Sequence, residues 1–486
     1  MEAIWKEDIT LKKREQAVGC FEREIVVIGG GMTGLLTALE LKRTGKQVVV
    51  LEAGRIAGGQ TGHTTAKITS QHGLCYDRLF HRVGADEARC YWEANRAAID
   101  EYRHLVEEYN IDCDFKCLSS YLYTTGDDSV LRNEEQALRS LGIPMKIVKS
   151  TELPFEVTRA ICFEHQAQFH PLKWIAGFAG ELEIYEESPV RRLEQVTCEP
   201  DEGQENAGQN GRIQTRVYTD RACVTAQAIV IATHYPVWNL PGFYFLRQHQ
   251  ERSYVVALEG CRELQGMYYS ADVGGFSLRS AGPYLLLGGA SHRTGKQRGE
   301  EYEILRKAAK AYFPKARIVG QWAAQDCMPH DGLPFIGRYS LCKKNWYVAT
   351  GYHKWGMSFS MVAALLLTDY ITGKENTWAE LFSSQRLLVK AGIGNFLADV
   401  GESVVGLTAG WCWPGTKVVH RKQDESPNRQ LESTKEQRMC LRCTHLGCKL
   451  NWNEEEASWD CPCHGSRYDE NGILLDEPAQ ENLRRL

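Results

Sequence analysis

Residues 24–34 read EIVVIGGGMTG, a short apolar run that passes directly into glycines. An apolar run of this kind is typical of a strand buried on both faces of a parallel sheet. Gly29, Gly31 and Gly34 fit the spacing GxGxxG, in which glycines allow the backbone to approach a pyrophosphate. The stretch therefore predicts a strand, a phosphate-binding turn and the start of a helix.

The residues that follow complete the same unit. We expect a helix over residues 35–43, closed by Gly45, and a second strand over residues 47–51 that leads into Glu52. The helix N-terminus would face the charge of the pyrophosphate, and the Glu52 carboxylate would bind ribose hydroxyls. A GxGxxG match alone is weak evidence, but here strand, turn, helix, second strand and acid follow in the required order. The sequence predicts a Rossmann-like α/β domain that binds a dinucleotide.

We assign this site to FAD. The turn lies near the start of the chain, which is typical of flavoproteins, and a second GxGxxG followed by a helix and an acid is not found. Residues 58–67 form another loop rich in glycine and threonine, which includes Thr61 and Gly62. Its backbone amides can lie near phosphate or flavin, although an ordinary flexible loop has the same composition.

A second strand-to-helix turn lies late in the chain. We expect a strand over residues 346–349, after which GYHKWGM at 351–357 opens an apolar helix. This turn, the run DGLPFIG at 331–337 and the N-terminal fingerprint resemble the glycine/sarcosine/D-amino-acid oxidase family over residues 24–375. The resemblance implies a flavin-ring loop that includes Gly351, Gly356 and Met357.

The resemblance also implies an activity and a domain organisation. Members oxidise the C–N bond of an amine or amino acid by hydride transfer to the flavin, and an α+β substrate domain covers the FAD-binding domain. We expect a leader at 1–23, FAD-binding segments at about 24–75, 155–235 and 328–375, substrate-domain segments at about 76–154 and 236–327, and a helical connector at 376–411.

Several polar residues are candidates for the substrate face. His353 and Lys354 lie on the expected flavin loop, where Lys354 would stabilise negative charge on the reduced flavin or simply be solvated. Arg252 is a candidate to pair a substrate carboxylate bidentately, or a surface arginine. Tyr254, Lys67 and His72 complete the set, and Cys327 is interpreted as a small buried residue rather than a covalent flavin attachment.

The last part of the chain carries a cysteine- and histidine-rich pattern. CTHLGC at 443–448 and CPCHGS at 461–466 each offer a Cys and a His at close spacing. A mixed-ligand [2Fe–2S] centre needs two thiolates on one iron and two imidazoles on the other. We assign Cys443 and Cys461 to the first iron and His445 and His464 to the second. A structural zinc with the same four ligands is the alternative, and it gives Cys448 and Cys463 no role.

This stretch, with Tyr468 two residues after Ser466, resembles the Rieske iron–sulfur domain in its disulfide-clamped form. The resemblance implies a small all-β domain over residues 412–486 and a disulfide between Cys448 and Cys463. It further implies that the Ser466 and Tyr468 hydroxyls hydrogen-bond the cluster and ligand sulfurs and raise the reduction potential.

Charge, hydrophobicity and cysteine distribution restrict the partners and the location that we expect for this protein. The net charge of −5 leaves no basic footprint, so a nucleic-acid partner is not expected. The longest apolar stretch, residues 356–371, is too short for a comfortable membrane span and contains Asp369. Eleven of the 17 cysteines are scattered from Cys20 to Cys342 without framework spacing, which favours reduced thiols in the cytoplasm.

These features favour a dehydrogenase of an amine or amino acid that passes electrons from FAD to its own cluster and then to an external acceptor. Two alternatives stay open. The cluster could feed electrons to the flavin for oxygen activation, as in a monooxygenase, or the chain could be a non-catalytic redox sensor or electron-transfer module. The absence of a nicotinamide site favours the dehydrogenase, because flavin reduction must then come from substrate.

Overall fold

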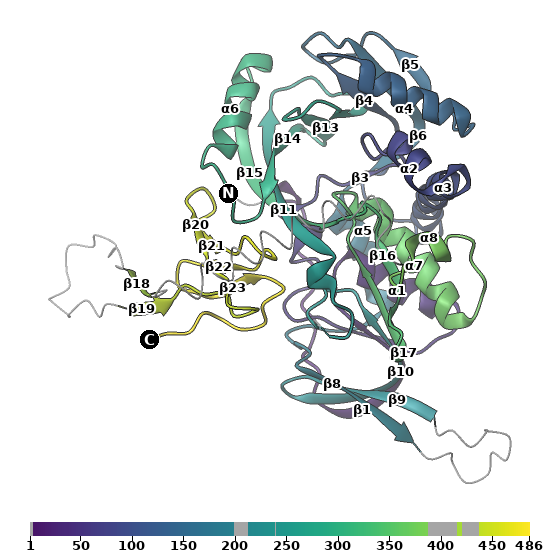
Figure 1. The fold of residues 1–486 in the computed structure, drawn as a ribbon, viewed down its shortest axis with the longest axis vertical. Coiled ribbons are helices and arrows are strands. Elements are labelled where there is room, and N and C mark those ends of the chain that lie inside the picture. Colours follow the sequence, from purple (N-terminus) through teal and green to yellow (C-terminus); the bar gives the residue numbers. More distant parts are fainter. Residues whose placement is uncertain (1–2, 199–211, 239, 387–415, 420–436) are drawn as a thin grey trace.

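The computed structural model describes residues 3–198, 212–238, 240–386, 416–419 and 437–486 (Figure 1). One layer is an eight-stranded, mostly parallel sheet. Its order is β16 (Phe335–Ser340), β17 (Lys343–Thr350), β10 (Ala222–Ile231), β1 (Gly19–Ile28), β2 (Val48–Leu51) and β7 (Glu183–Tyr185), with β9 (Arg212–Tyr218) and β8 (Arg192–Cys198) extending from β10.

The apolar run at the start of the chain forms the centre of this sheet. Residues 25–28 of β1 are buried and pair in parallel with β2 on one side and β10 on the other. The strand begins at Gly19, whereas we expected it at Glu24, so part of the predicted leader belongs to the sheet. Trp5 is also buried and donates from Nε1 to the carbonyl of Thr64 at 2.8 Å.

Helices cover this sheet. Helix α1 (Met32–Arg43) joins β1 to β2 and packs against α7 (Gly356–Thr372), which follows β17. Helix α3 (Ala85–Glu108) packs against α7, although we expected its residues in the substrate domain. Of the predicted connector, only the short α8 (Ala379–Phe382) and the residues to 386 are described, and residues 387–411 lie outside the described part of the chain.

A second sheet has nine strands, most of them from the segments that we expected in the substrate domain. Its order is β15 (Arg317–Pro329), β11 (Gln248–Glu259), β14 (Tyr284–Arg293), β13 (Ser277–Ala281), β12 (Gly266–Ser270), β4 (Lys116–Thr124), β6 (Arg159–Gln168) and β3 (Lys67–Ile68), with β5 (Lys146–Val148) on β6. Helix α6 (Glu301–Tyr312) packs against β11 and β14, and α4 (Ser129–Ser140) packs against β6 and α2 (Tyr76–Val83). Helix α5 (Pro171–Phe178) follows β6 in the chain. Strand β6 pairs antiparallel with β4, so it belongs here and not with the FAD-binding segment at 155–235.

The described residues of the C-terminal part, 416–419 and 437–486, form strands and no helix, as the sequence predicts. This part contains the pair β18 (Thr416–Val419) and β19 (Gln437–Cys440) and a sheet of β20 (Asn451–Asn453), β21 (Ser458–Asp460), β22 (Arg467–Asp469) and β23 (Leu474–Asp476). This domain lies beside β11 and β15 (Figure 1). Among the described residues, no helix is long and apolar enough to cross a membrane.

Candidate active site and metal centre

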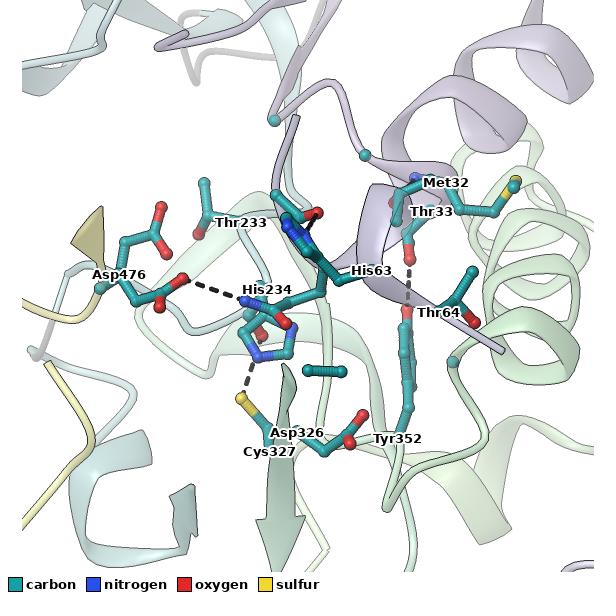
Figure 2. A pocket seen from close by; sticks show the side chains of 18 of the residues that line it. Met32, Thr33, His63, Thr64, Thr233, His234, Asp326, Cys327, Tyr352 and Asp476 are labelled. Carbon is teal, nitrogen blue, oxygen red and sulfur yellow. Dashed lines mark hydrogen bonds between the residues drawn. The ribbon is translucent and has the colours of Figure 1, made fainter. Parts of the chain in front are cut away.

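A cavity of about 810 Å³ opens where the parallel strands end (Figure 2). Gly29 and Gly31 follow β1, Glu52 follows β2, His234 lies beyond β10, and the loop 351–357 follows β17. Ligands of open α/β sheets bind outside the carboxyl ends of the strands, so the cavity lies where the fingerprint predicts a dinucleotide. Its volume is in the upper part of the range for small-molecule sites.

The glycine-rich turn and Glu52 form one end of the cavity. The Glu52 carboxylate accepts hydrogen bonds from the amides of Gly30 at 2.6 Å and Gly54 at 2.8 Å, and burial raises its pKa. Thr61 Oγ1 accepts from the Met32 amide at 3.0 Å and so ties the second loop to the start of α1. Turn, acid and threonine therefore form one connected wall.

Three glycines in and near this wall have different structural roles. Gly31 lines the cavity, and a Cβ added to it would meet only Thr61 Oγ1 at 3.4 Å. A Cβ on Gly34 would lie 1.9 Å from the carbonyl oxygen of Gly29, so Gly34 allows α1 to pack against the turn and does not line the cavity. Gly62 does not line the cavity either, because it lies in a short turn and donates to the Gly59 carbonyl.

The second end of the cavity carries a buried group of charges. Lys354 Nζ lies 2.9 Å from Glu251 Oε2, and the Glu251 carboxylate raises the pKa of Lys354 although burial opposes this. Asp326 lies opposite Glu251 in the register of β11 and β15, and burial raises its pKa to about 6. Lys354 and Asp326 both line the cavity, together with Gly351, Gly356 and Met357.

Lys67 is a second lysine on the cavity wall. Its Nζ donates to Ser277 Oγ and to the Tyr268 carbonyl at 3.4 Å. Burial, helped by the charge of Arg279, lowers the pKa of Lys67 to about 7. Two lysines of different pKa therefore face the same cavity.

Two other residues predicted for the substrate face, Arg252 and Tyr254, contact protein groups instead. Arg252 does not line the cavity, because its Nη2 pairs with Glu456 Oε2 at 2.6 Å in the C-terminal domain. Tyr254 lines the cavity, but its hydroxyl lies 3.1 Å from His292 Nε2 and accepts from Asn453 at 3.4 Å. Arg252 is therefore not available to a substrate carboxylate as the sequence suggested, and the Tyr254 hydroxyl contacts protein groups.

Two predicted histidines lie outside the cavity wall. His72 is buried, with its ring nitrogens 2.6 Å from the Tyr91 hydroxyl and the Thr69 carbonyl, and it stacks on Trp355. His353 does not line the cavity, and burial lowers its pKa to about 3. Of the four catalytic candidates, Lys354 is therefore the one whose charged group remains on the wall.

Sequence reasoning missed several wall residues. Asp326 and His234 line the cavity, yet neither belongs to a recognisable pattern, and Gln60 lies within the loop 58–67 but was not singled out there. A position just beyond a parallel strand was the available signal for His234, since β10 ends at Ile231. Asp326 lies inside a strand of the second sheet, where local sequence gives no signal.

The four predicted iron ligands come from two adjacent loops. The rings of His445 and His464 lie 5.0 Å apart, and His464 is buried. The thiols of Cys443 and Cys461 are buried, and hydrogen bonding from Cys461, opposed by burial, lowers the pKa of Cys443 to about 6. Two thiols and two imidazoles form the donor set that a [2Fe–2S] centre with mixed ligands requires.

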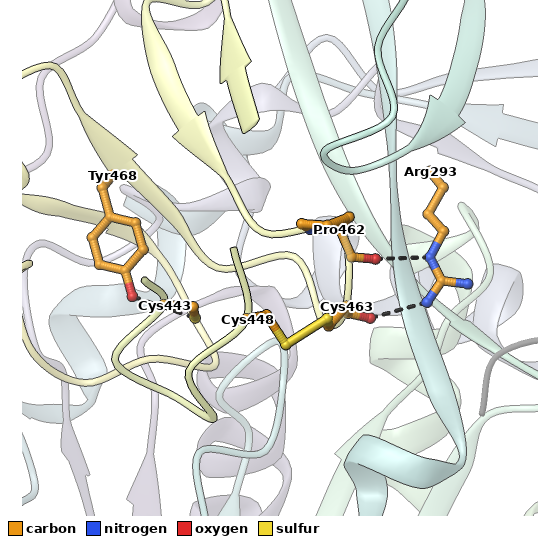
Figure 3. Close-up of a disulfide and its surroundings, with 6 residues drawn as sticks. All are labelled: Arg293, Cys443, Cys448, Pro462, Cys463 and Tyr468. Atoms are coloured by element: carbon orange, nitrogen blue, oxygen red, sulfur yellow. Dashed lines mark hydrogen bonds between the residues drawn. A yellow bond between two sulfur atoms is a disulfide. The ribbon is translucent and has the colours of Figure 1, made fainter. Parts of the chain in front are cut away.

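The surrounding residues also fit a cluster. The disulfide Cys448–Cys463 is present, as predicted, and joins the two loops (Figure 3). The Tyr468 hydroxyl lies 3.5 Å from Cys443 Sγ. Arg293 of β14 donates to the carbonyls of Pro462 at 3.1 Å and Cys463 at 3.0 Å, so the second sheet holds one loop in place.

The C-terminal domain also forms part of the cavity wall. The residues that contribute are Leu474, Leu475, Asp476, Glu477, Ala479 and Gln480. The same cavity is lined by Gly29 and Glu52 from the other end of the chain. The candidate cluster domain and the dinucleotide turn therefore share one cavity.

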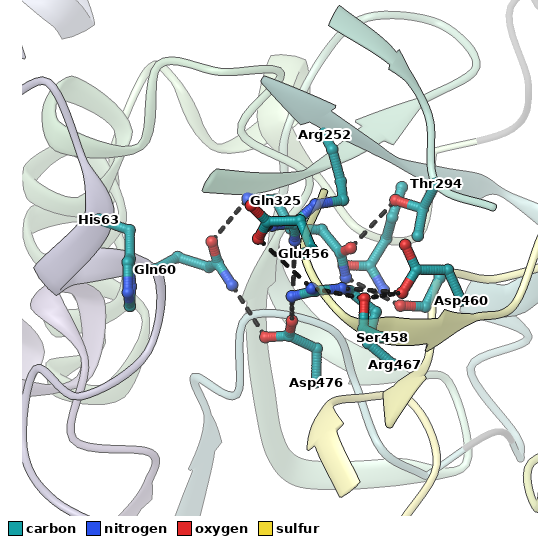
Figure 4. A network of polar contacts seen from close by, with 12 residues as sticks. Gln60, His63, Arg252, Thr294, Gln325, Glu456, Ser458, Asp460, Arg467 and Asp476 are labelled. Carbon is teal, nitrogen blue, oxygen red and sulfur yellow. Dashed lines mark hydrogen bonds and ion pairs between the residues drawn. The ribbon is translucent and has the colours of Figure 1, made fainter. Parts of the chain in front are cut away.

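A buried ion network fixes this arrangement (Figure 4). Arg252 pairs with Glu456, and Arg467 pairs with Asp460 at 3.0 Å and Asp476 at 2.8 Å. Gln60, on the loop after β2, donates to Asp476 Oδ1 at 3.0 Å. The network thus joins β11, the loop after β2 and the C-terminal sheet.

The sequence profile of FAD dependent oxidoreductases matches residues 24–370. The chain belongs to this family. The profile of the Rieske [2Fe-2S] domain matches residues 431–486, so this flavoprotein ends in a Rieske domain and its cofactors are FAD and a [2Fe–2S] cluster. The residues of the glycine turn and of the two cluster loops fit these groups.

Relatives share the whole or part of this flavoprotein. A putative Rieske 2Fe-2S iron-sulfur protein of Bacillus subtilis (strain 168), YhfW, is 33% identical, covering 100% of this chain and 97% of the relative. Gamma-glutamylputrescine oxidoreductase of Escherichia coli (strain K12) is 27% identical over 36% of this chain and 44% of its own length. Glycine oxidase from Geobacillus kaustophilus has the same fold, with a TM-score of 0.61 at 17% identity over 76% of this chain and 99% of that chain.

Proposed function

We propose that this flavoprotein is a dehydrogenase that oxidises an amine or amino acid and passes the electrons one at a time to its own Rieske cluster. One observation carries the proposal: residues of the Rieske domain, including Asp476 and Glu477, line the same cavity as the FAD turn. A shared wall keeps the two redox groups close, which favours electron transfer within one chain. An external acceptor then reoxidises the cluster.

The substrate class rests on the active-site end of the cavity and on the relatives. Lys354, held by Glu251, would place a positive charge beside the flavin ring and stabilise the negative charge that hydride transfer brings to it. Lys67, whose pKa is lowered to about 7 by burial, and Asp326 would offer polar contacts to a substrate ammonium or carboxylate. The relationship to gamma-glutamylputrescine oxidoreductase supports an amine among the candidate substrates.

We assign the iron ligands by chemistry. Cys443 and Cys461 would bind one iron through thiolates, and His445 and His464 would bind the other through imidazole nitrogens. The Tyr468 hydroxyl beside Cys443, together with Ser466, would stabilise the reduced cluster by hydrogen bonding. Zinc in place of iron and acid-labile sulfide in the purified protein would contradict this assignment.

We infer the direction of electron flow from the reduction potential expected for the Rieske cluster. Rieske centres range from about −150 to +300 mV, against about −400 mV for plant-type clusters ligated by cysteine alone. Hydroxyl donors to the cluster place it toward the upper end of that range. Electrons should therefore run from the reduced flavin to the cluster.

Anaerobic titration with a panel of amines and amino acids tests the proposal. The flavin absorbance should bleach first, and the EPR signal of the reduced cluster should follow in stopped-flow and freeze-quench samples. Reduction of the cluster by an external donor before any flavin reduction would contradict the direction and favour the monooxygenase. No flavin reduction by any amine or amino acid would reject the substrate class.

We further propose that the protein is located in the cytoplasm. Eleven cysteines of the described residues are neither in the disulfide nor assigned to iron. Since free thiols persist in a reducing compartment, a cytoplasmic location fits, with the Cys448–Cys463 disulfide kept by its burial. Thiol counting on protein from gently lysed cells would test this, because a disulfide-rich form would contradict it.

A further inference from the structure

We propose that the segment Asp476–Gln480 of the Rieske domain, here called the bridging segment, is part of the FAD-binding site and links FAD binding to the integrity of the cluster domain. The inference requires only that FAD occupies the cavity, so it is independent of the direction of electron flow. Asp476, Glu477, Ala479 and Gln480 all line the cavity.

Three hydrogen bonds tie the bridging segment to the flavoprotein body. Gln60 Nε2 donates to Asp476 Oδ1 at 3.0 Å, and Gln250 Nε2 donates to the Glu477 carbonyl at 2.9 Å. Gln480 Nε2 donates to the Val237 carbonyl at 3.0 Å. Gln60 and Val237 line the cavity themselves, so the segment is attached to the loops that surround the dinucleotide.

The other side of the bridging segment is attached to the cluster loops. The Ala479 amide donates to Ser466 Oγ at 3.0 Å, and Thr444 Oγ1 donates to the carbonyl of the next residue, Glu481, at 2.8 Å. Ser466 and Thr444 belong to the two loops that carry the predicted iron ligands. A movement of either loop is therefore transmitted directly to the cavity wall.

Glu477 is the residue best placed to contact the dinucleotide. It lines the cavity together with Glu52, and the Glu52 carboxylate is among the charges that raise its pKa. Burial, together with the Asp476 carboxylate, raises the pKa of Glu477 to about 7. A carboxyl group that is partly protonated can donate a hydrogen bond to an oxygen of the ribose–pyrophosphate portion.

These contacts imply that FAD binding and docking of the Rieske domain are thermodynamically linked. Any group that binds FAD only when the Rieske domain is docked makes FAD binding and docking mutually favourable, by the same factor in both directions. Loss of FAD should loosen the bridging segment, and loss of the bridging contacts should weaken FAD binding.

The test is FAD titration into flavin-depleted full-length protein that retains its cluster, with flavin fluorescence as the readout. Glu477→Ala should raise the Kd roughly five- to tenfold, the range expected for one lost hydrogen bond. Glu477→Gln should stay within about twofold, because the amide still donates. The matched control is Glu470→Ala, an exposed acid in the same domain, which should not change the Kd. An unchanged Kd for Glu477→Ala would overturn the inference.

A second measurement needs no variant. Hydrogen exchange of the wild-type protein with and without FAD should slow over residues 474–481 as well as over residues 29–34 when FAD binds. Slower exchange at 29–34 with no change at 474–481 would overturn the linkage, whatever the variants do. Because neither readout measures turnover, both are separate from the proposed dehydrogenase activity.

Discussion

Replacement of Gly31 by valine should remove FAD and leave the protein folded. Gly31 is the N-cap of α1 with φ of −79° and ψ of −176°, a conformation that valine adopts without strain. The nearest atom to an added Cβ is Thr61 Oγ1 at 3.4 Å, so the side chain fits against the protein and extends into the cavity. At an N-cap, valine is less favourable than glycine by about 1 kcal/mol or less.

The loss of FAD affinity can be estimated from the same geometry. A side chain at Gly31 occupies the space through which the pyrophosphate approaches the amides at the start of α1. Hydrogen bonds to a charged group contribute about 1.5–3 kcal/mol each, so losing two of them costs about 3–6 kcal/mol. The Kd should rise by roughly two to four orders of magnitude.

Gly34→Val is the matched control. A Cβ there would lie 1.9 Å from the Gly29 carbonyl oxygen, so α1 must move away from β1. We expect Gly34→Val to lower stability by about 3 kcal/mol or more, as overpacking of a tight contact does. The assay compares flavin content after desalting with thermal unfolding of the flavin-free proteins. A Gly31→Val protein that retains FAD with wild-type affinity would refute the placement of the pyrophosphate at this turn.

Other substitutions test the rest of the site. Glu52→Ala should weaken FAD binding less than Gly31→Val, by about 1–3 kcal/mol, since ribose hydrogen bonds alone are lost; equal losses in fluorescence titration would argue against the ribose assignment. Ser466→Ala combined with Tyr468→Phe should lower the cluster potential measured by EPR-monitored redox titration and leave flavin reduction by substrate unchanged, and an unaltered potential would exclude their role. Arg252→Met should reduce the free energy of unfolding by less than the about 3–5 kcal/mol of a buried pair broken outright, because Glu456 loses Arg252 but keeps Arg467 at 3.5 Å, and a wild-type melting curve would show that the pair contributes little.

The sequence by itself determined the local chemistry of both cofactor sites. The turn after β1 and the two cluster loops each consist of residues that are close together in the chain, so their spacing reports their geometry directly. The same holds for the Cys448–Cys463 disulfide, whose partners lie on those loops. The α/β class followed because an apolar strand next to a glycine turn is typical of one architecture, and the all-β class was implied by the resemblance of the cluster loops to the Rieske domain.

Only the tertiary structure decided what lies opposite each of these loops. The guanidinium group of Arg252 is suited to bind a substrate carboxylate. Its partner, however, is Glu456, which is 204 residues away and becomes a neighbour only through docking of the Rieske domain. Asp326 meets Glu251 because of the register between β11 and β15, which depends on the whole sheet. The bridging segment lines the FAD cavity for the same reason. Contacts between distant segments depend on how the domains pack, and no local spacing encodes that.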